Sequence, residues 1–586
     1  MRKELLLLGA FGMLTTATLC AQEFHLQPTP QEYITQKDSV DIPRQYQILS
    51  GNSVQDGPAL PLLRSLMPEE VLGASFRVYI GVKGDKIIKK YQHRIPRKSE
   101  GYFLKIEKDC IVIAGADERG AYYGVQTLAQ LLALDKLPLA EVTDYPDVPY
   151  RGVVEGFYGA PWSQEARIRQ LDFYGRNKMN VYIYGPKDDP YHRTPNWRKP
   201  YPVREGEELK VLVNRAKENN VIFYWAIHPG QDIRWNEEDR SLLLQKFESM
   251  YQLGVRGFAV FFDDISGEGT KADKQAELLN YIDDHFVKVK RDVAPLILCP
   301  TEYNKSWTDV EGGYLTTLGD KLNEGIKVMW TGDMVVATID KSTLDFVNPL
   351  LKRKAYIWWN FPVSDYVQDH LLLGPVYGNG LDIKDDMSAF VSNPMEHAEA
   401  SKISLYSVAD YTWNMENYDS ETSWKHAVRD LMPLHAEYLE IFAAHNSDPG
   451  QNGHRFRREE SVAIQPALSA LLKAYQEKNE IDEDAYRQVA EECRKIIVAA
   501  DGLLASGNEN RPLITEIRPW LIQFKQVGEY GAEVLNMIRL RQQKDAFIGS
   551  YEHARALLVL MGETDAQYKA GIKSGSLHLM PTFQAL

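Results

Sequence analysis

The sequence predicts an α/β protein: a (β/α)8 TIM-type catalytic barrel with a small N-terminal α/β domain before it and a C-terminal helical domain after it. Three observations carry this prediction. Strand-like runs and one helical pattern occupy the first quarter of the chain, eight apolar segments alternate with helix-sized stretches between residues 151 and 410, and 3.6-residue periodicity dominates from about residue 430. Eight alternating units are typical of a closed parallel barrel.

The first residues have the pattern of a secretory signal peptide. A charged start, Met1 to Lys3, precedes an apolar stretch from Leu5 to Leu19. We expect cleavage near Ala21, so residues 1–21 form the signal peptide and the mature chain is exported to the periplasm or the extracellular space. A lipid anchor at Cys20 is the less favoured alternative, because Leu19 is not the small residue that such sites prefer. No apolar run of about 18 residues follows, so we expect no membrane span.

Residues 22–147 are predicted to form the N-terminal α/β domain. Residues 102–106 alternate between apolar and polar, residues 110–114 are apolar, and residues 118–132 carry apolar side chains at helical spacing. The stretch 144–150 contains two prolines and interrupts both periodicities. It therefore marks the boundary with the next domain.

Residues 148–432 are predicted to form the barrel, because nearly every apolar segment ends in polar or aromatic residues. In a parallel barrel, the carboxyl ends of the strands meet at one rim, where catalytic residues gather. We therefore expect the active site at the ends of these segments. The eight predicted strands are residues 151–158, 180–187, 221–229, 257–264, 296–303, 327–331, 355–360 and 403–409.

Residues 433–586 are predicted to form the helical domain. Helical spacing of apolar residues recurs at 431–442, 462–475, 485–504 and 514–541. We expect this domain to support the barrel structurally. No uninterrupted heptad is present, so the sequence leaves the oligomeric state open.

Composition narrows the class of partner. The net charge is −14 and no Lys/Arg-rich run occurs, which argues against binding to nucleic acid or to an anionic membrane surface. The 11 Trp and 32 Tyr suit either stacking on sugars or core packing. Cys110, Cys299 and Cys493 form no CxxC pattern, so neither a disulfide framework nor a zinc site is indicated. We expect a neutral substrate, no metal and no cofactor.

The most informative stretch is FFDDISGEG at 261–269, where a buried strand ends in Asp263 and Asp264. For a single Asp, capping of the following helix would be the simpler interpretation. Two adjacent Asp residues make this interpretation less favoured. Side chains alternate along a regular strand, so the two carboxylates should have different roles. They fit badly both the facing pair at about 5 Å of ordinary retaining glycosidases and the wider pair of inverting ones, which leaves room for a water. They suit a reaction in which one Asp protonates the leaving oxygen and the other orients a nucleophilic 2-acetamido group of the substrate.

Seven motifs extend this interpretation along the chain. In order, they are RGVVEGFYGAPWS, YIYGPKDDPYH, FAVFFDDISGEGT, CPTEYNKSW, MWTGD, YIWWNFPVSDY and SNPMEHAE. Together they resemble glycoside hydrolase family 84, the retaining β-N-acetylglucosaminidases often called O-GlcNAcases, and bacterial members most closely. The resemblance covers roughly residues 25–560. It implies a hexosaminidase-like N-terminal domain, a catalytic barrel and a helical domain.

The resemblance also implies roles for twelve residues. Asp263 would orient the acetamido nitrogen and stabilise an oxazoline intermediate, Asp264 would act as general acid and then base, and Tyr303 would hydrogen-bond the acetamido oxygen. The remaining residues would bind the sugar: Thr331, Val335 and Trp358 around the N-acetyl methyl, Gly156 and Lys187 near O3, Asn360, Asp365 and Asn393 at the other hydroxyls, and Tyr158 at the floor or the leaving-group side.

Two nearby residues receive simpler interpretations. Trp358 and Trp359 alternate on a strand, so one should face the sugar and the other the core. His228 ends a predicted strand, but a single histidine there is more often a hydrogen-bonded structural residue. We expect it to take no part in proton transfer.

The resulting hypothesis is a retaining exo-β-N-acetylglucosaminidase that uses substrate-assisted catalysis. Its partners would be β-linked GlcNAc glycans or O-GlcNAc-modified proteins. Two alternatives stay open: a broader β-hexosaminidase that also accepts GalNAc, and a GlcNAc-binding protein without catalytic activity. The natural aglycone is not determined by the sequence.

Overall fold

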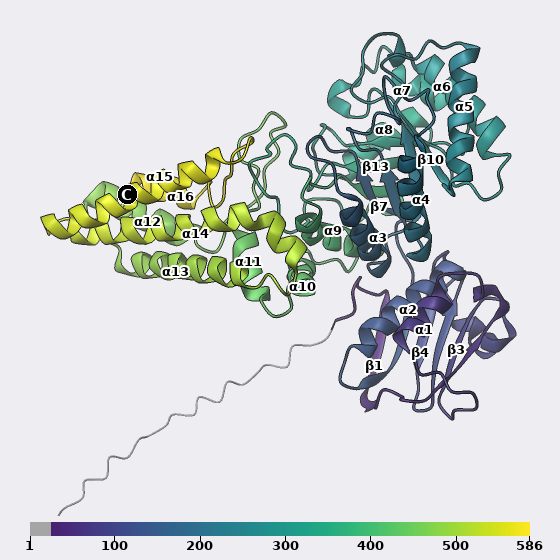
Figure 1. Cartoon of the computed structure of the whole chain (residues 1–586), viewed down its shortest axis with the longest axis horizontal. Helices are drawn as coiled ribbons and strands as arrows, with labels where there is room; N and C mark the ends of the chain where they lie inside the picture. Colours follow the sequence, from purple (N-terminus) through teal and green to yellow (C-terminus); the bar gives the residue numbers. More distant parts are fainter. Residues whose placement is uncertain (1–24) are drawn as a thin grey trace, which may run out of the picture.

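The computed structural model describes residues 25–586, so the predicted signal peptide at 1–21 and Cys20 lie outside the described residues. Three units follow one another along the chain (Figure 1). The N-terminal α/β unit lies against one end of the barrel, and the helical domain extends from the side of the barrel. The predicted fold class, a (β/α)8 barrel between an α/β domain and a helical domain, is confirmed.

The N-terminal unit is a six-stranded mixed sheet in the order β1-β6-β4-β5-β3-β2. Helices α1 (Ala59–Leu66) and α2 (Glu118–Leu132) pack on the sheet and share one hydrophobic core with it. Asp117 caps α2 by accepting a hydrogen bond from the backbone N of Gly120. The strands are β1 (Glu32–Val40), β2 (Gln47–Ser50), β3 (Arg77–Val82), β4 (Tyr102–Ile106), β5 (Cys110–Gly115) and β6 (Leu137–Asp144).

The barrel is closed by eight parallel strands whose residues are almost all buried. Its strands are β7 (Tyr150–Glu155), β8 (Val181–Tyr184), β9 (Ile222–Ile227), β10 (Gly257–Phe261), β11 (Ile297–Cys299), β12 (Lys327–Trp330), β13 (Ala355–Trp359) and β14 (Met387–Ser392). Its helices are α3 (Gln164–Arg176), α4 (Val203–Glu218), α5 (Glu237–Gln252), α6 (Ala272–Ile282), α7 (Tyr314–Lys321), α8 (Lys341–Leu351) and α9 (Ala398–Trp413).

The eighth predicted strand was wrong. Residues 403–409 lie inside α9, and the strand that closes the barrel is β14. All sixteen residues of α9 are buried, because it packs against α3, α10, α14, β7 and β14. A helix buried on every side loses its amphipathic pattern, so a short apolar run within it resembles a buried strand. The long connection at 360–386, which contains no helix, hid the true strand.

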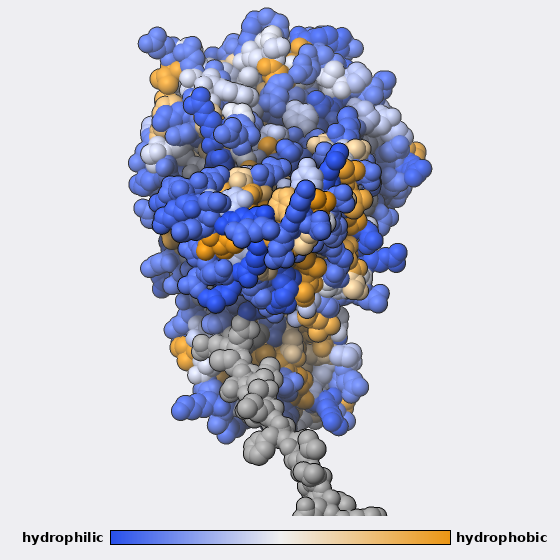
Figure 2. Space-filling view, turned by 90° about the vertical axis from the view of Figure 1, so that its left-hand side faces the viewer, coloured by the Kyte–Doolittle hydropathy of each residue, from blue (hydrophilic) through white to orange (hydrophobic). Residues whose placement is uncertain are grey.

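The helical domain is built on the long helices α13, α14 and α15, and α14 packs along both of the others. Its free end is mostly hydrophilic with scattered hydrophobic side chains (Figure 2). Within residues 25–586, no helix is both long and apolar enough to cross a membrane. The helices are α10 (Ser420–Leu431), α11 (Ala436–Ala444), α12 (Gln465–Lys478), α13 (Glu483–Ala505), α14 (Arg511–Leu540), α15 (Lys544–Ala566) and α16 (Leu579–Ala585).

A fully buried polar cluster joins the N-terminal unit to the barrel. Lys178 Nζ lies 3.1 Å from Asp144 Oδ2 and donates to the hydroxyl of Tyr102 at 2.9 Å. The Tyr102 hydroxyl donates to Asp144 Oδ2, and Trp413 Nε1 donates to Asp144 Oδ1 at 2.8 Å. Both oxygens of the buried carboxylate are therefore satisfied, and the cluster fixes the two units against each other.

Replacing Asp144 by Ala leaves the Lys178 ammonium buried without its carboxylate. We expect Asp144→Ala to lower the free energy of unfolding by about 3–5 kcal/mol, the usual cost of breaking a buried pair on one side. Urea unfolding followed by tryptophan fluorescence measures this loss. Glu208→Ala is the matched control, because Glu208 pairs with Arg204 on an exposed helix face and its loss should change stability little. Equal effects of the two substitutions would contradict the importance of the cluster.

Candidate active site

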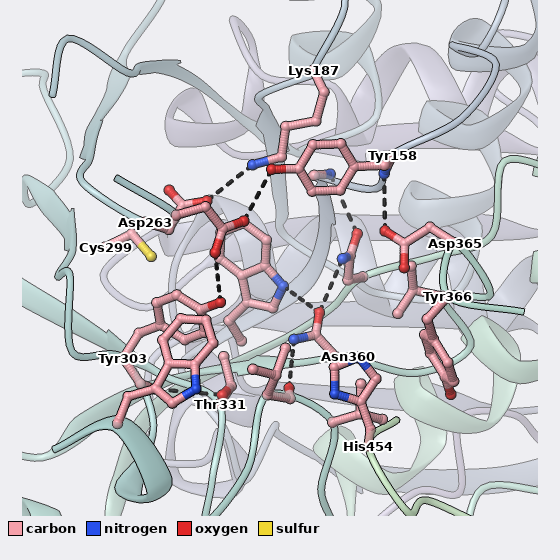
Figure 3. A pocket seen from close by; sticks show the side chains of 18 residues that line it. Tyr158, Lys187, Asp263, Cys299, Tyr303, Thr331, Asn360, Asp365, Tyr366 and His454 are labelled. Atoms are coloured by element: carbon pink, nitrogen blue, oxygen red, sulfur yellow. Dashed lines mark hydrogen bonds and ion pairs between the residues drawn. The ribbon is translucent and has the colours of Figure 1, made fainter. Parts of the chain in front are cut away.

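One pocket of about 240 Å³ opens at the carboxyl ends of the barrel strands, and all twelve predicted site residues line it (Figure 3). They come from segments that are far apart in the sequence, and the closed barrel brings them together. The twelve are Gly156, Tyr158, Lys187, Asp263, Asp264, Tyr303, Thr331, Val335, Trp358, Asn360, Asp365 and Asn393.

Six further residues line the pocket but were not predicted: Cys299, Trp307, Val336, Val363, Tyr366 and His454. Trp307 and Tyr366 lie within the recognised motifs, so the sequence held a signal for them. His454 lies in the loop between α11 and α12 of the helical domain. Its ring meets the edge of Tyr366 at 4.9 Å between centroids. Nothing in its local sequence marked this long-range contact.

The two adjacent carboxylates enter the same pocket because the strand ends before them. Strand β10 stops at Phe261, and Asp264 has a left-handed backbone with φ of 53°. Asp tolerates this conformation better than most residues do. The alternation expected of a regular strand therefore does not apply here. The surroundings of the two still differ, since Asp263 is 4% exposed whereas Asp264 is exposed at the mouth.

Asp263 is a buried carboxylate held in its charged form. Burial alone would raise its pKa, but the Lys187 ammonium at 2.9 Å from Oδ2 and His228 at 3.4 Å from Oδ1 hold the pKa of Asp263 well below its usual range. His228 Nε2 also donates to the backbone O of Asp263 at 2.8 Å. Among the described residues, Oδ1 has no hydrogen-bond donor. This oxygen is enclosed by the protein, so the pocket presents Asp263 to a ligand as a charged carboxylate held by Lys187.

Two phenols hold Asp264. The hydroxyl of Tyr303 donates to Oδ1 at 2.8 Å, and the hydroxyl of Tyr158 donates to Oδ2 at 3.0 Å. Burial and the two aspartates raise the pKa of Tyr303, so its hydroxyl remains a donor at neutral pH. The backbone N of Tyr158 donates to Asp365 Oδ2 at 2.9 Å. Tyr158 therefore links the end of the pocket that holds Asp264 to the end that holds Asp365. Burial raises the pKa of Asp365.

A buried amide pair positions Trp358. Its Nε1 donates to Asn360 Oδ1 at 2.9 Å, and Asn393 Nδ2 donates to the same oxygen at 3.0 Å. The backbone N of Gly156 donates to Asn393 Oδ1. The neighbouring Trp359 is fully buried in the core, so only one of the two indoles lines the pocket.

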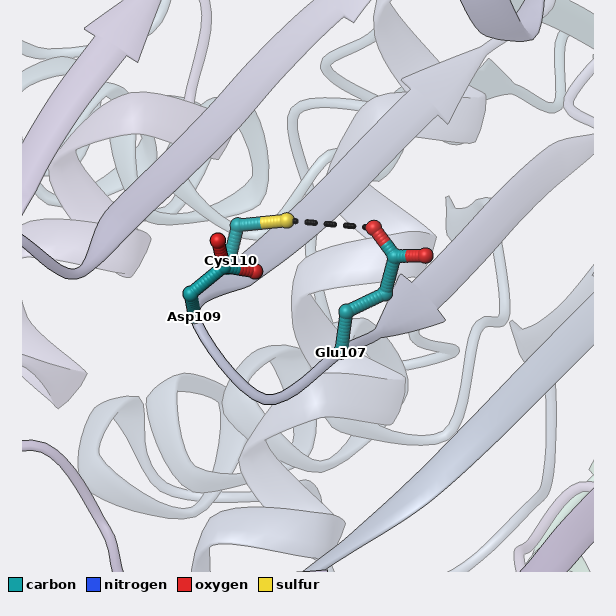
Figure 4. A group of neighbouring side chains, drawn as sticks. All are labelled: Glu107, Asp109 and Cys110. Carbon is teal, nitrogen blue, oxygen red and sulfur yellow. Dashed lines mark hydrogen bonds between the residues drawn. The ribbon is translucent and has the colours of Figure 1, made fainter.

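Outside this pocket, within residues 25–586, the only group of side chains spaced like metal ligands is Glu107, Asp109 and Cys110, at the turn between β4 and β5 (Figure 4). Cys110 Sγ donates to Glu107 Oε2 at 3.4 Å. Burial and the Glu107 carboxylate raise the pKa of Cys110 to about 12, which keeps the thiol protonated. A protonated thiol is a poor metal ligand, because metals bind the thiolate.

Gly156 leaves room for the indole of Trp358. A Cβ atom at this position would lie 2.6 Å from Trp358 Cζ2, and the indole cannot move without losing its bond to Asn360. We expect Gly156→Ala to destabilise the protein by about 1–3 kcal/mol through overpacking. Gly206→Ala is the control: its Cβ would meet nothing closer than 3.9 Å inside α4, and alanine there should stabilise the protein slightly. Thermal unfolding gives the melting temperature of each variant relative to the wild type. Equal shifts in the two variants would refute the packing argument.

Three family profiles match successive parts of the chain. A profile described as beta-N-acetylglucosaminidase matches residues 151–444, which is half of the chain. One described as the post-catalytic domain of bacterial GH84 matches residues 460–586. One described as domain 2 of glycosyl hydrolase family 20 matches residues 23–145.

Curated relatives and solved structures agree with these profiles. Protein O-GlcNAcase of Rattus norvegicus and that of Mus musculus are each 36% identical over 276 residues, which cover 45% of this chain but only 30% of each relative. The solved structure of CpGH84B is 31% identical, with a TM-score of 0.87 over 96% of this chain and 100% of that chain. A variant of Thermobaculum terrenum O-GlcNAc hydrolase is 26% identical, with a TM-score of 0.66 over 75% of this chain and 94% of that chain. The chain belongs to glycoside hydrolase family 84.

Proposed function

We propose that this protein is a retaining, exo-acting β-N-acetylglucosaminidase that removes terminal β-linked GlcNAc by substrate-assisted catalysis. The observation that carries the proposal is the pairing of Asp263, a buried charged carboxylate held by Lys187, with Asp264 at the pocket mouth. The first is suited to orient an amide N–H, and the second to exchange a proton with an exposed leaving group.

The pocket suits one sugar that carries an N-acetyl group. Its volume of about 240 Å³ is below the roughly 300–1,000 Å³ typical of pockets for larger ligands, which supports removal of a terminal residue. Cys299, Val335 and Trp358 give its inner end an apolar lining suited to a methyl group. Burial raises the pKa of Cys299 well above its usual range, so the thiol is neutral there.

In the first step, the substrate amide N–H donates to the Asp263 carboxylate, and the acetamido carbonyl oxygen attacks the anomeric carbon. The bond from that carbon to the aglycone oxygen breaks, and Asp264 supplies the proton that the leaving oxygen takes up. The product is the protonated form of an oxazoline, an oxazolinium ion, whose positive charge is stabilised by the Asp263 carboxylate. The hydroxyl of Tyr303 lies beside Asp264 and is placed to donate to the acetamido oxygen.

In the second step, water attacks the anomeric carbon from the side that the aglycone has left. Asp264, now a carboxylate, accepts a proton from this water, and the bond to the oxazoline oxygen breaks. Two inversions at one carbon give net retention of configuration. Lys187, Asp365 and Asn393 surround the space for the sugar hydroxyls and hold the ring during both steps.

The relatives support the substrate class. Those named Protein O-GlcNAcase are more than three times as long as the segment they share with this chain, so their whole activity is not carried over. We propose glycoproteins or other glycoconjugates with terminal β-linked GlcNAc as substrates. Export of the protein is also proposed, and the charged and apolar pattern of residues 1–21 supports it.

Hydrolysis of an aryl β-N-acetylglucosaminide, compared with the matching β-glucoside, tests the proposed function. We expect the wild type to cleave only the N-acetyl sugar, because the glucoside lacks the nucleophile. Asp264→Asn should lower kcat/KM by about 10²–10⁴-fold for a poor leaving group and far less for an activated one, since only the former needs a proton. Asp263→Ala should impair both. Cleavage of neither sugar by the folded wild type would favour a GlcNAc-binding protein, and equal cleavage of the GalNAc analogue would favour a broader β-hexosaminidase.

The charge of Lys187 should determine the pH at which kcat/KM is lost on the acidic side. Because the pKa of Asp263 is depressed in the wild type, Asp263 stays ionised as the pH falls. Lys187→Met removes the largest charge that opposes burial, so the pKa of Asp263 rises and activity is lost at a higher pH. We expect the acidic limb of kcat/KM to move up by about one pH unit or more. Lys187→Arg retains the charge and should keep the limb near its original position; an unmoved limb in the Met variant would contradict the assignment.

A further inference from the structure

A second and larger cavity, of about 680 Å³, lies at the opposite end of the barrel from the active site. Its walls come from the amino ends of β9, β10 and β11, from α4, and from the N-terminal unit, which contributes Pro58 and Arg119. The cavity therefore lies where the N-terminal unit meets the barrel (Figure 1).

The charges around this cavity do not balance. Four cationic side chains line it, Arg119, Lys217, Arg256 and Arg291, against a single carboxylate, Asp292. That carboxylate is already bound by Arg256 at 2.6 Å and by the Tyr251 hydroxyl at 2.9 Å. Three cations remain beyond this pair, although the chain as a whole has a net charge of −14.

Within residues 25–586, two of these three cations have no carboxylate partner, and the third shares one. In the described part of the chain, neither Lys217 nor Arg291 is within ion-pair distance of a carboxylate. Arg119 lies 3.6 Å from Glu100 Oε1, but Glu100 is bound more closely by Arg151 at 2.6 Å. The position of Lys217 in the last turn of α4 is favourable for a cation, whereas Arg291 lies in a loop and gains nothing of this kind.

Asn220 lies beside these cations. It is 9% exposed and lines the cavity, and its enclosed Nδ2 has no acceptor among the described residues. Arg119 donates to its backbone oxygen at 3.1 Å. The excess of positive charge in the cavity, carried by guanidinium and ammonium donors, selects for an oxyanion.

The apolar walls of the cavity indicate what kind of molecule the oxyanion belongs to. Val213, Val221, Phe223 and Val293 give the cavity apolar sides. A free oxyanion needs little of this volume, whereas a sugar phosphate or sugar sulfate would set its ring against these sides. We propose that this cavity is a binding site for a phosphate or sulfate group, separate from the active site and large enough for the small organic molecule that carries it.

Calorimetric titration of the full-length protein tests this proposal with three probes: inorganic phosphate, glucose 6-phosphate and glucose. We expect saturable binding of at least one phosphate probe at one site per chain, and none of glucose. Binding of both phosphates with equal affinity would identify the free oxyanion as sufficient, and tighter binding of glucose 6-phosphate would show that the apolar walls hold the sugar. No saturable binding of either phosphate to the wild type would overturn the proposal.

Variants locate the site. Lys217→Ala combined with Arg291→Ala should weaken phosphate binding by at least about tenfold, because two charged donors are lost. Both residues are exposed, so the fold should be retained, and unchanged hydrolysis at the distant active site would verify this. Lys473→Ala combined with Arg555→Ala is the matched control, since it removes the same two charges from exposed positions of the helical domain. Equal loss of binding in both double variants would show non-specific attraction and refute the site.

Discussion

The active site depends on keeping one buried carboxylate charged. Burial opposes the ionisation of Asp263, and only the nearby Lys187 and His228 reverse this effect. These three residues follow β8, β9 and β10, which are hydrogen-bonded neighbours in the barrel. The parallel register of three consecutive strands therefore sets the charge state of the site. A barrel meets this requirement because all its strands end at the same rim.

The far wall of the pocket depends on a different part of the chain. The loop that carries His454 belongs to the helical domain and is held against the barrel by Arg458. This buried guanidinium lies over the rings of Phe361 and Phe456 and donates to the backbone O of Tyr377 at 2.7 Å. Such cation–π contacts are strongest where water is excluded. The helical domain thus contributes to the shape of the site as well as supporting the barrel.

The sequence predicted what depends on local pattern and on recognised motifs. Seven of the eight barrel strands and twelve of the eighteen residues that line the pocket were identified this way, because strand ends and motifs are local features. The predictions failed where tertiary structure overrides local pattern. Residues 403–409 lack an amphipathic pattern because α9 is buried on every side, and His454 reaches the pocket only through the docking of a distant domain. The left-handed backbone of Asp264 could not be predicted either, because nothing in the sequence shows where the strand ends.

The two ends of the barrel differ in how completely their charges are paired. At the junction with the N-terminal unit, Lys178 and Asp144 neutralise each other, and both carboxylate oxygens of Asp144 accept hydrogen bonds. At the active site, Lys187 pairs with Asp263 Oδ2 beside the pocket, but Asp263 Oδ1 accepts no hydrogen bond among the described residues. The larger cavity at the opposite end of the barrel resembles the active site in this respect, because its unpaired groups line open space. Lys217 and Arg291 face this space without a carboxylate partner among the described residues, and Arg119 shares its partner Glu100 with Arg151. The resulting excess of positive charge at one site of an acidic chain is the feature that an anionic ligand would balance.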